Sequence, residues 1–365
     1  MPVHPLTNPL AFTHPDAELK STVGGRSYSP TISFELQPPR NPDRAPQFWA
    51  TAKRLVTYRP DFISVTYGAG GHDHNTTQDV VVELLNGTAV EPMAHLTCIR
   101  ASREDITGLV NSMLGAGTRA FLALRGDPPN GERKWQTMPN GINSAIDLIK
   151  IVRKIEQERA ATDASFALRA SLHPLVIAVA AFPGGNKSSG TTQEQEIQRL
   201  LEKQEAGANF AITQLLFDAQ LYFDFVAAAR EAGVTMPIIA GIVPVTGLGQ
   251  LDKISSITKI SPPPELVAAL IGESDNFAEF VDYAPLGGGT LFGANMHGAE
   301  TGPEEYDAVR QYQVGIEYTT KLASELLAGG APGLHLFTFN QAAPSLDVLR
   351  RLEIRPRITN LAQAL

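Results

Sequence analysis

The stretch SFELQPPR, residues 33–40, ends a short run of alternating apolar residues with two prolines. The run TISFEL, residues 31–36, is typical of a β-strand because successive side chains alternate between two faces. Pro38 and Pro39 have no backbone N–H and therefore stop such a strand. Glu35 lies one residue before the predicted strand end, between Phe34 and Leu36, where an ionisable carboxyl group is unexpected.

Similar apolar runs recur along the chain, and a helical pattern follows most of them. The first four runs start at residues 31, 61, 91 and 119, which are 30, 30 and 28 residues apart, a normal period for a strand followed by a helix. Eight such units predict an α/β fold, specifically a (β/α)8 TIM barrel. A doubly wound open sheet is the alternative, but no run leads into a GxGxxG turn. The predicted strands are residues 31–36, 61–66, 91–97, 119–124, 175–181, 209–214, 237–242 and 334–339.

The helical patterns lie between these runs, and several end in glycine, a common helix stop. We expect an irregular N-terminal arm over residues 1–28, followed by one catalytic barrel over residues 29–365. A long loop follows the fourth predicted strand, and an insertion separates the seventh and eighth. The predicted helices are residues 46–58, 76–87, 102–117, 144–160, 193–209, 219–233 and 306–329.

The charge, the cysteine count and the apolar runs argue against several classes of function. The 365 residues carry a formal net charge of −8, which disfavours nucleic acid and anionic membranes as partners. A single cysteine, Cys98, excludes an intrachain disulfide and a multi-cysteine metal site. The N-terminus shows no secretory signal and no apolar run is long enough to span a membrane, so we expect a cytoplasmic protein.

Polar residues at the strand ends are the candidate site residues, because chemistry in such barrels gathers at the carboxyl ends of the strands. Burial of Glu35 among apolar side chains raises the pKa of its carboxyl group and suits a general acid, although a structural glutamate is an equal alternative. Arg125 and Asp127 suit an anion and an amidine-like edge, or a mutual surface salt bridge. Gln214 can read a heterocycle, or bond to the backbone.

Other candidates are weaker. His95 is a strand histidine that contacts a ligand or is satisfied within the core. The glycine-rich residues 68–71 suit a phosphate or only a flexible loop. No HExxH or related spacing is present, so we predict no metal.

The ordered motifs resemble the methylenetetrahydrofolate reductase family over about residues 30–355. SFELQPPR is similar to the SFEFxPP signature of that family, and six further segments resemble its motifs in the same order. Each motif is modest, whereas seven in the right order are highly specific. The six segments are FISVTYGAGG, AHLTCI, LALRGDPP, GANFAITQLLFD, PIIAGIVPVT and PGLHLFTFN.

The resemblance implies reduction of 5,10-methylenetetrahydrofolate to 5-methyltetrahydrofolate by NADH or NADPH, with FAD as relay in most members. Glu35 matches the general acid of the family, Asp127 matches the aspartate that contacts the pterin, and Gln214 matches a folate-contacting glutamine. Cofactor-binding positions are also implied. They are Thr66, Tyr67, His95, Arg125, Gly126, Asp127, Ala180, Phe182 and Lys203.

The chain departs from the family pattern after its fifth predicted strand. Phe182 replaces a tyrosine, and a His-Pro-Glu-Ala segment is replaced by residues 186–189. A basic pair expected near the flavin diphosphate becomes Glu202 and Lys203, and Gln341 replaces an arginine after Asn340. An acidic side chain beside a diphosphate is unfavourable, although Lys187 and Arg199 could compensate for it. The sequence therefore leaves open whether FAD binds, and hydride transfer directly from the nicotinamide is the alternative.

Two other functions remain as alternatives to the reductase. One is a different flavin or pterin barrel enzyme, although neither a proline dehydrogenase-like oxidase nor a pterin methyltransferase combines Glu35, the RGD segment and Gln214. The other is a non-catalytic folate-binding or assembly subunit on the same barrel. The sequence does not distinguish NADH from NADPH, and it leaves a homo-oligomer open.

Overall fold

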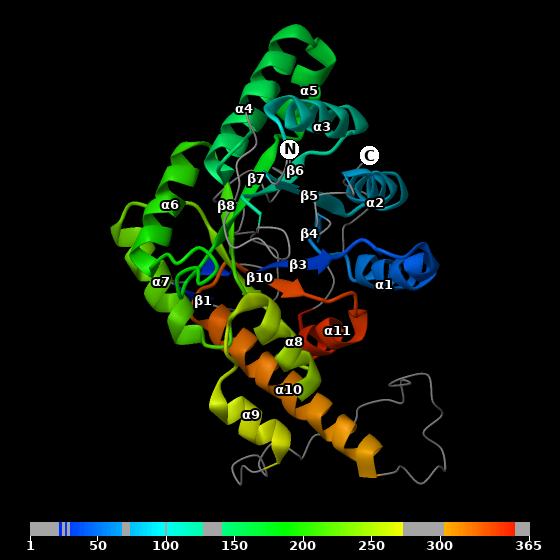
Figure 1. Cartoon of the computed structure of the whole chain (residues 1–365), viewed down its shortest axis with the longest axis vertical. Coiled ribbons are helices and arrows are strands. Elements are labelled where there is room, and N and C mark those ends of the chain that lie inside the picture. The colour runs from blue at the N-terminus through cyan, green and yellow to red at the C-terminus, as the bar shows by residue number, and fades with distance from the viewer. Residues whose placement is uncertain are drawn as a thin grey trace.

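The computed structural model describes residues 22–23, 26–27, 30–67, 74–98, 101–126, 141–272 and 303–354. Eight parallel strands close into a barrel in chain order, and the last strand pairs with the first (Figure 1). The predicted (β/α)8 barrel is therefore confirmed. Its strands are β3 (Thr31–Leu36), β4 (Phe62–Val65), β5 (Glu91–Thr97), β6 (Ala120–Leu124), β7 (Val176–Ala181), β8 (Phe210–Thr213), β9 (Ile238–Ile242) and β10 (Gly333–Phe337).

An apolar cluster fills the interior of the barrel. Phe62 on β4 and Phe210 on β8 have ring centroids 5.8 Å apart, although their strands are not neighbours. Alternate residues of a strand point to opposite faces, so the side chains in register with Phe62 also point inward. His335 on β10 stacks on Phe62 at 6.0 Å and has a hydrogen-bond contact of 2.8 Å between its Nδ1 and the Oγ of Ser33.

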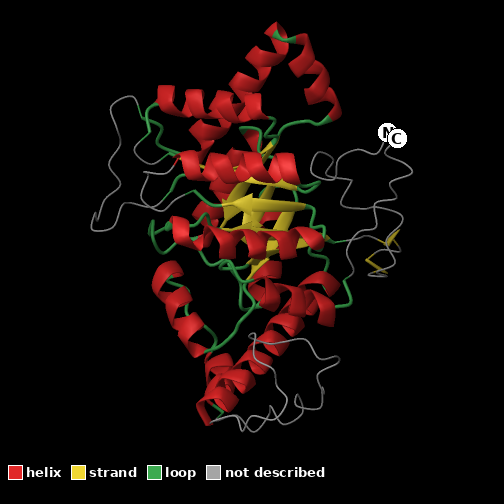
Figure 2. Cartoon of the chain, turned by 90° about the vertical axis from the view of Figure 1, so that its right-hand side faces the viewer, coloured by secondary structure: helices red, strands yellow, loops and turns green. Residues whose placement is uncertain are grey.

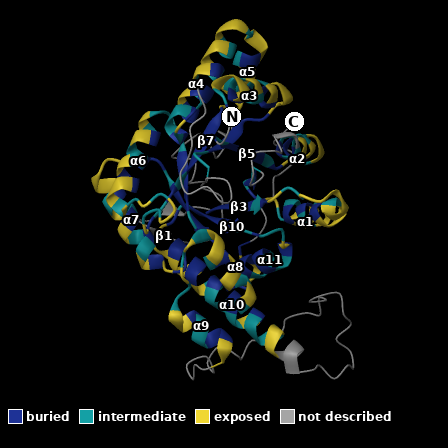
Figure 3. Ribbon diagram, in the orientation of Figure 1, coloured by how far each residue is buried: buried dark blue, intermediate teal, exposed yellow. Residues whose placement is uncertain are grey.

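The helices pack around the outside of the barrel, and their inner faces are buried with the outer faces of the strands (Figures 2 and 3). Phe34, for example, points outward and makes an edge-to-face contact with Tyr58. The helices are α1 (Ala45–Thr57), α2 (His74–Gly87), α3 (Arg103–Ala116), α4 (Ala145–Thr162), α5 (Ala164–Leu172), α6 (Gln193–Glu205), α7 (Ala219–Glu231), α8 (Leu248–Thr258), α9 (Pro264–Ile271), α10 (Pro303–Ala328) and α11 (Ala342–Arg351), with a 3₁₀ turn at Pro42–Arg44.

Helices α5, α8, α9 and α11 were absent from the sequence-based prediction. Asp163 separates α4 from α5, and its side chain accepts a hydrogen bond from the Phe166 N–H, so one residue ends one helix and caps the next. The short helix α9 lies within the segment predicted as an insertion, and α8 lies just before it, after β9. Each is too short for a strong periodic signal, and packing stabilises it instead.

Several predicted features lie wholly or partly outside the described residues. They include most of the N-terminal arm, the glycine-rich residues 68–71, most of the loop after β6, and residues 273–302 of the insertion. Within the predicted arm, β1 (Thr22–Val23) and β2 (Arg26–Ser27) form an antiparallel pair. In the part of the chain that the structure describes, no helix combines the length and apolar character needed to cross a membrane.

Candidate active site at the carboxyl end of the barrel

Glu35 points into the barrel near the carboxyl end of β3. It is in register with Ser64 of β4 and Phe337 of β10, and Ser64 lies two residues after the inward-pointing Phe62. Phe34 and Leu36, its neighbours in sequence, are fully buried in the outer core between strands and helices. Strand alternation therefore separates the carboxyl group from both apolar neighbours and turns it toward the barrel interior.

The environment of Glu35 favours a protonated carboxyl group. Its side chain is 13% exposed, and burial raises its pKa to about 7, partly offset by a hydrogen bond from the Gln37 side chain that lowers it. The Nε2 of His95 lies 3.9 Å from the Glu35 Oε2. Burial also lowers the pKa of His95 to about 3, so this imidazole is neutral near pH 7 and does not hold Glu35 ionised. A carboxyl group with a pKa near 7 is suited to donate a proton at neutral pH.

Three polar atoms near this end of the barrel lack a hydrogen-bond partner among the described residues. They are the His95 Nε2, the Ser64 Oγ and the Thr97 Oγ1, each shielded from solvent. Thr97 lies two residues after His95 on β5, so both side chains point to the same face. Buried polar groups are normally hydrogen-bonded, so unpartnered ones indicate a place for a polar ligand or ordered water.

The residues after β4, β6 and β8 lie at the same end of the barrel as Glu35. Thr66 follows β4, where its N–H donates to the Leu36 carbonyl and its carbonyl accepts from Thr77 of α2, and Tyr67 comes next. Arg125 and Gly126 follow β6, and Gly126 has a left-handed φ of 86°. Asp127 lies outside the described residues. Gln214 follows β8, with its N–H bonded to the Ala181 carbonyl and its side-chain oxygen accepting from Leu215.

Lys203 reaches the barrel from α6. Its ammonium group donates to the carbonyl of Ala180 on β7 at 2.9 Å, and Phe182 follows directly after that strand. Burial lowers the pKa of Lys203 to about 8, and the nearby Glu196 partly opposes this effect. Glu196 is itself buried and pairs with Arg199 at 2.8 Å. These side chains form a small charged network beside the end of β7.

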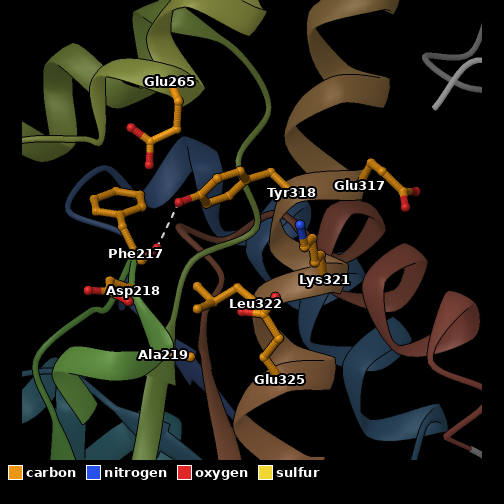
Figure 4. A pocket seen from close by; sticks show the side chains of 9 residues that line it. All are labelled: Phe217, Asp218, Ala219, Glu265, Glu317, Tyr318, Lys321, Leu322 and Glu325. Carbon is orange, nitrogen blue, oxygen red and sulfur yellow. Dashed lines mark hydrogen bonds between the residues drawn. The ribbon is translucent and has the colours of Figure 1, made fainter. Parts of the chain in front are cut away.

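A separate acidic groove of about 330 Å³ lies between the start of α7, helix α9 and helix α10 (Figure 4). Tyr318 closes one side of it through a hydrogen bond from its hydroxyl to the Phe217 carbonyl, 2.7 Å long. Four carboxyl groups and one ammonium group line the groove, so its charge disfavours an anionic ligand such as a nucleotide or a folate. None of the predicted site residues that the structure describes lines it.

The sequence analysis did not select Ser64 or Thr97. Both are small polar residues at inward positions of predicted strands, in the segments ISVT and AHLT. A polar residue at a position that alternation assigns to the barrel interior is a signal that could have identified them. The contact between His95 and Glu35 had no such signal, because it joins strands that are not adjacent in the barrel.

The fold and this arrangement define a (β/α)8-barrel protein with a buried acid among polar groups at the carboxyl ends of its strands. The family model described as methylenetetrahydrofolate reductase matches residues 22–283. The chain belongs to the methylenetetrahydrofolate reductase family.

Curated members of this family are similar in sequence to this chain over most of its length. A methylenetetrahydrofolate reductase (NADH) from Arabidopsis thaliana is 29% identical over 322 residues, which cover 88% of this chain and 48% of the relative. The 5,10-methylenetetrahydrofolate reductase of Escherichia coli is 27% identical over 325 residues, which cover 89% and 91% of the two chains. The chain therefore spans about half the length of the plant relatives and most of the bacterial ones.

A solved structure shares the fold. A protein from Clostridium thermocellum, described as binding two copies of 5-methyl-5,6,7,8-tetrahydrofolic acid, superposes with a TM-score of 0.52 at 13% identity. The superposition covers 89% of this chain and 96% of that protein.

Proposed function

We propose that the carboxyl end of the barrel reduces 5,10-methylenetetrahydrofolate to 5-methyltetrahydrofolate with NADH or NADPH as hydride donor. The observation that carries this proposal is Glu35, an inward-pointing acid with a pKa raised to about 7 beside a neutral imidazole. The family and the names of the curated relatives support the choice of substrate.

The chemistry of this reduction needs one proton and one hydride. One carbon–nitrogen bond of the methylene bridge breaks, the nitrogen takes the proton, and the carbon takes the hydride, so NAD(P)H becomes NAD(P)⁺. A protonated carboxylic acid in a site of low water content can supply the proton because its ionised form is not solvated there. We assign that role to Glu35 and assign contacts with the pterin ring to Gln214 and Asp127.

The described residues fit only one end of an FAD molecule. The unpartnered His95 Nε2 and Thr97 Oγ1, together with Thr66, Arg125 and Gly126, are suited to a polar ring system at the strand ends. A flavin or a pterin ring presents such polar edges. The ring end of a flavin is therefore compatible with the side chains present.

The loop after β7 fits the diphosphate end of FAD poorly. Asn186 and Thr191 pair through both backbone groups, at 3.0 and 3.1 Å, and the Asn186 side chain accepts from the Ser188 N–H. Thr191 donates to the buried Glu196, which also pairs with Arg199. The loop thus satisfies its own polar groups, and the Arg199 guanidinium is already paired with the Glu196 carboxylate, which weakens any attraction to a diphosphate. We propose that hydride passes directly from NAD(P)H to the folate.

The reductase activity is tested by following NADH and NADPH oxidation with methylenetetrahydrofolate for the wild type and for Glu35→Gln. We expect a loss of kcat of roughly 100-fold or more in the variant, because the amide cannot donate the proton. In the wild type, kcat should fall as the pH rises above about 7, as Glu35 loses its proton.

The exposed Glu231→Gln variant is the control and should keep the wild-type rate. Full activity of Glu35→Gln would remove Glu35 from the assigned role. A wild type without activity, with or without added FAD, would favour the non-catalytic subunit. The visible absorption spectrum of desalted protein tests the cofactor separately, since a persistent flavin band would contradict direct transfer.

A further inference from the structure

The backbone just beyond β3 has polar groups that the barrel ladder does not pair. The Leu36 carbonyl accepts from the Thr66 N–H, and the β3–β4 pairing ends at this point. Gln37 follows, and Pro38 and Pro39 after it have no N–H to donate. The Gln37 N–H and carbonyl therefore bond either to water or to another part of the molecule.

Asn340, three residues after β10, supplies both partners through its side chain. The Gln37 N–H donates to the Asn340 Oδ1 at 2.9 Å, and the Asn340 Nδ2 donates to the Gln37 carbonyl at 2.7 Å. One side-chain amide thus continues the β10–β3 pairing as a backbone amide would. Thr338 adds a third contact, because its hydroxyl donates to the Glu35 carbonyl at 2.5 Å and accepts from the Asn340 N–H.

The backbone of this turn is in an uncommon conformation. Phe339 and Asn340 have φ angles of 47° and 58°, in the left-handed region that asparagine tolerates and a phenylalanine does not favour. The two bonds between Asn340 and Gln37 lie at an exposed position, where hydrogen bonds add little net stability. Backbone strain that is retained without a clear gain in stability points to a functional requirement for position.

The residue that Asn340 holds is the one that contacts the acid. The Gln37 side chain hydrogen-bonds to the Glu35 carboxyl group and lowers its pKa, against the larger opposing effect of burial. Gln37 is exposed, so its side chain would otherwise sample several rotamers and bond to water. Its orientation toward Glu35 therefore depends on a fixed backbone at residue 37.

We propose that Asn340 is a positioning residue whose side-chain amide fixes the Gln37 backbone and thereby aims the Gln37 side chain at the Glu35 carboxyl group. The proposal rests on the proposed function only in taking Glu35 as the proton donor. Asn340 acts from the end of the last barrel strand on the end of the first, across the seam where the barrel closes.

The test is a titration of Glu35 by carbon-13 NMR of protein labelled at the glutamate carboxyl carbon, with Glu35→Gln used to assign the signal. Asn340→Gly removes the amide and keeps a residue that tolerates a positive φ. We expect the Glu35 titration midpoint to rise by about half a pH unit or more in this variant, because the ionised carboxylate loses the Gln37 donor.

Two further variants separate positioning from general stability. Thr51→Ala removes only the 3.3 Å hydrogen bond to the Asn340 carbonyl and should leave the midpoint unchanged. Gln37→Leu should raise the midpoint in the wild-type background and add nothing in the Asn340→Gly background. A lower melting temperature of Asn340→Gly with an unchanged Glu35 midpoint, or additive shifts in the double variant, would overturn the proposal.

Kinetics give a second readout. In Asn340→Gly we expect the decline of kcat at high pH to move upward together with the Glu35 midpoint, and the KM for NADH to stay within about twofold. A wild type without reductase activity contradicts the proposed function and leaves the NMR test of Asn340 intact. An unshifted midpoint in an active enzyme contradicts the positioning role alone.

Discussion

The orientation of Glu35, and through it the pKa of its carboxyl group, follows from the alternation of side chains along β3. Phe34 and Leu36 pack outward into the core, whereas Glu35 turns inward toward His95. The apolar neighbours in sequence therefore do not themselves bury the carboxyl group. The barrel interior does, and it raises the pKa to about 7. A site that raises the pKa of an acid also lowers the stability of the folded state at pH values where that acid is ionised.

This linkage predicts a gain in stability for Glu35→Gln that depends on pH. The folded pKa of about 7 exceeds the ordinary value of 4.5, so the favourable contribution of Glu35 is complete below pH 4.5 and is lost as the pH rises through 7. We expect Glu35→Gln to be more stable than the wild type at pH 8 by on the order of 2 kcal/mol, with a much smaller difference at pH 4.5.

Urea unfolding at both pH values measures this difference. The exposed Glu231→Gln variant provides the matched comparison and, as a surface substitution, should change the free energy of unfolding by less than about 0.5 kcal/mol. If Glu35→Gln raised the free energy of unfolding equally at both pH values, the fold would not be holding the carboxyl group protonated.

At the scale of elements, α10 packs against the segment after β9 through a face of small residues. Gly315 and Thr319 lie one turn apart on this helix and both meet Val245. The Thr319 hydroxyl accepts from the Val245 N–H at 3.1 Å. A Cβ on Gly315 would lie 2.4 Å from the Val245 carbonyl oxygen, so only glycine permits this approach.

Gly315→Ala should therefore destabilise the protein even though alanine favours helices. The helix must shift away from Val245, and such overpacking typically costs about 1–3 kcal/mol. Gly108→Ala in α3 is the matched control, because its added Cβ would meet no atom within 4 Å. It should be neutral or stabilise by about 0.5–1 kcal/mol. Urea unfolding distinguishes the two, and equal effects would contradict the close packing of α10.

At the scale of the whole molecule, the barrel encloses two neutral histidines. Burial lowers the pKa of His95 and of His335 to about 3, and the nearby His95 adds to the lowering at His335. The unfolded chain binds protons at these residues near pH 6.5, whereas the folded barrel does not. Their contribution to stability is therefore present above pH 6.5 and is lost as the pH falls toward 3.

We predict that His335→Gln makes the stability of the fold less sensitive to acid. The variant should be less stable than the wild type at pH 7.5, because the contacts with Ser33 and Phe62 are lost or weakened. The fall in stability between pH 7.5 and 5 should be smaller than in the wild type. Thermal unfolding across this range measures it, and since Glu35 is present in both proteins, its opposite effect cancels. Parallel curves would contradict the burial of His335 as a neutral ring.

Much of the architecture follows from the sequence by itself. Each of the eight predicted strands overlaps an observed one, and 31–36 and 91–97 coincide with β3 and β5. The apolar alternation and the regular spacing carry this information locally, so strand identity needs no tertiary contact. The ordered motifs likewise led to the family, and placed Glu35, Thr66, Arg125 and Gln214 at strand ends. The sequence analysis did not predict helices α5, α8, α9 and α11, because each is too short to show a clear helical period.

The contacts between residues on different strands were determined by the tertiary structure alone. Closure brings β10 beside β3, so that Asn340 meets Gln37 from 303 positions away in the chain. It also brings His95 to 3.9 Å from Glu35 and the Lys203 ammonium group to the end of β7. Local patterns encode which face a side chain occupies, but the distance between two faces is set by how many strands close the barrel and in what register.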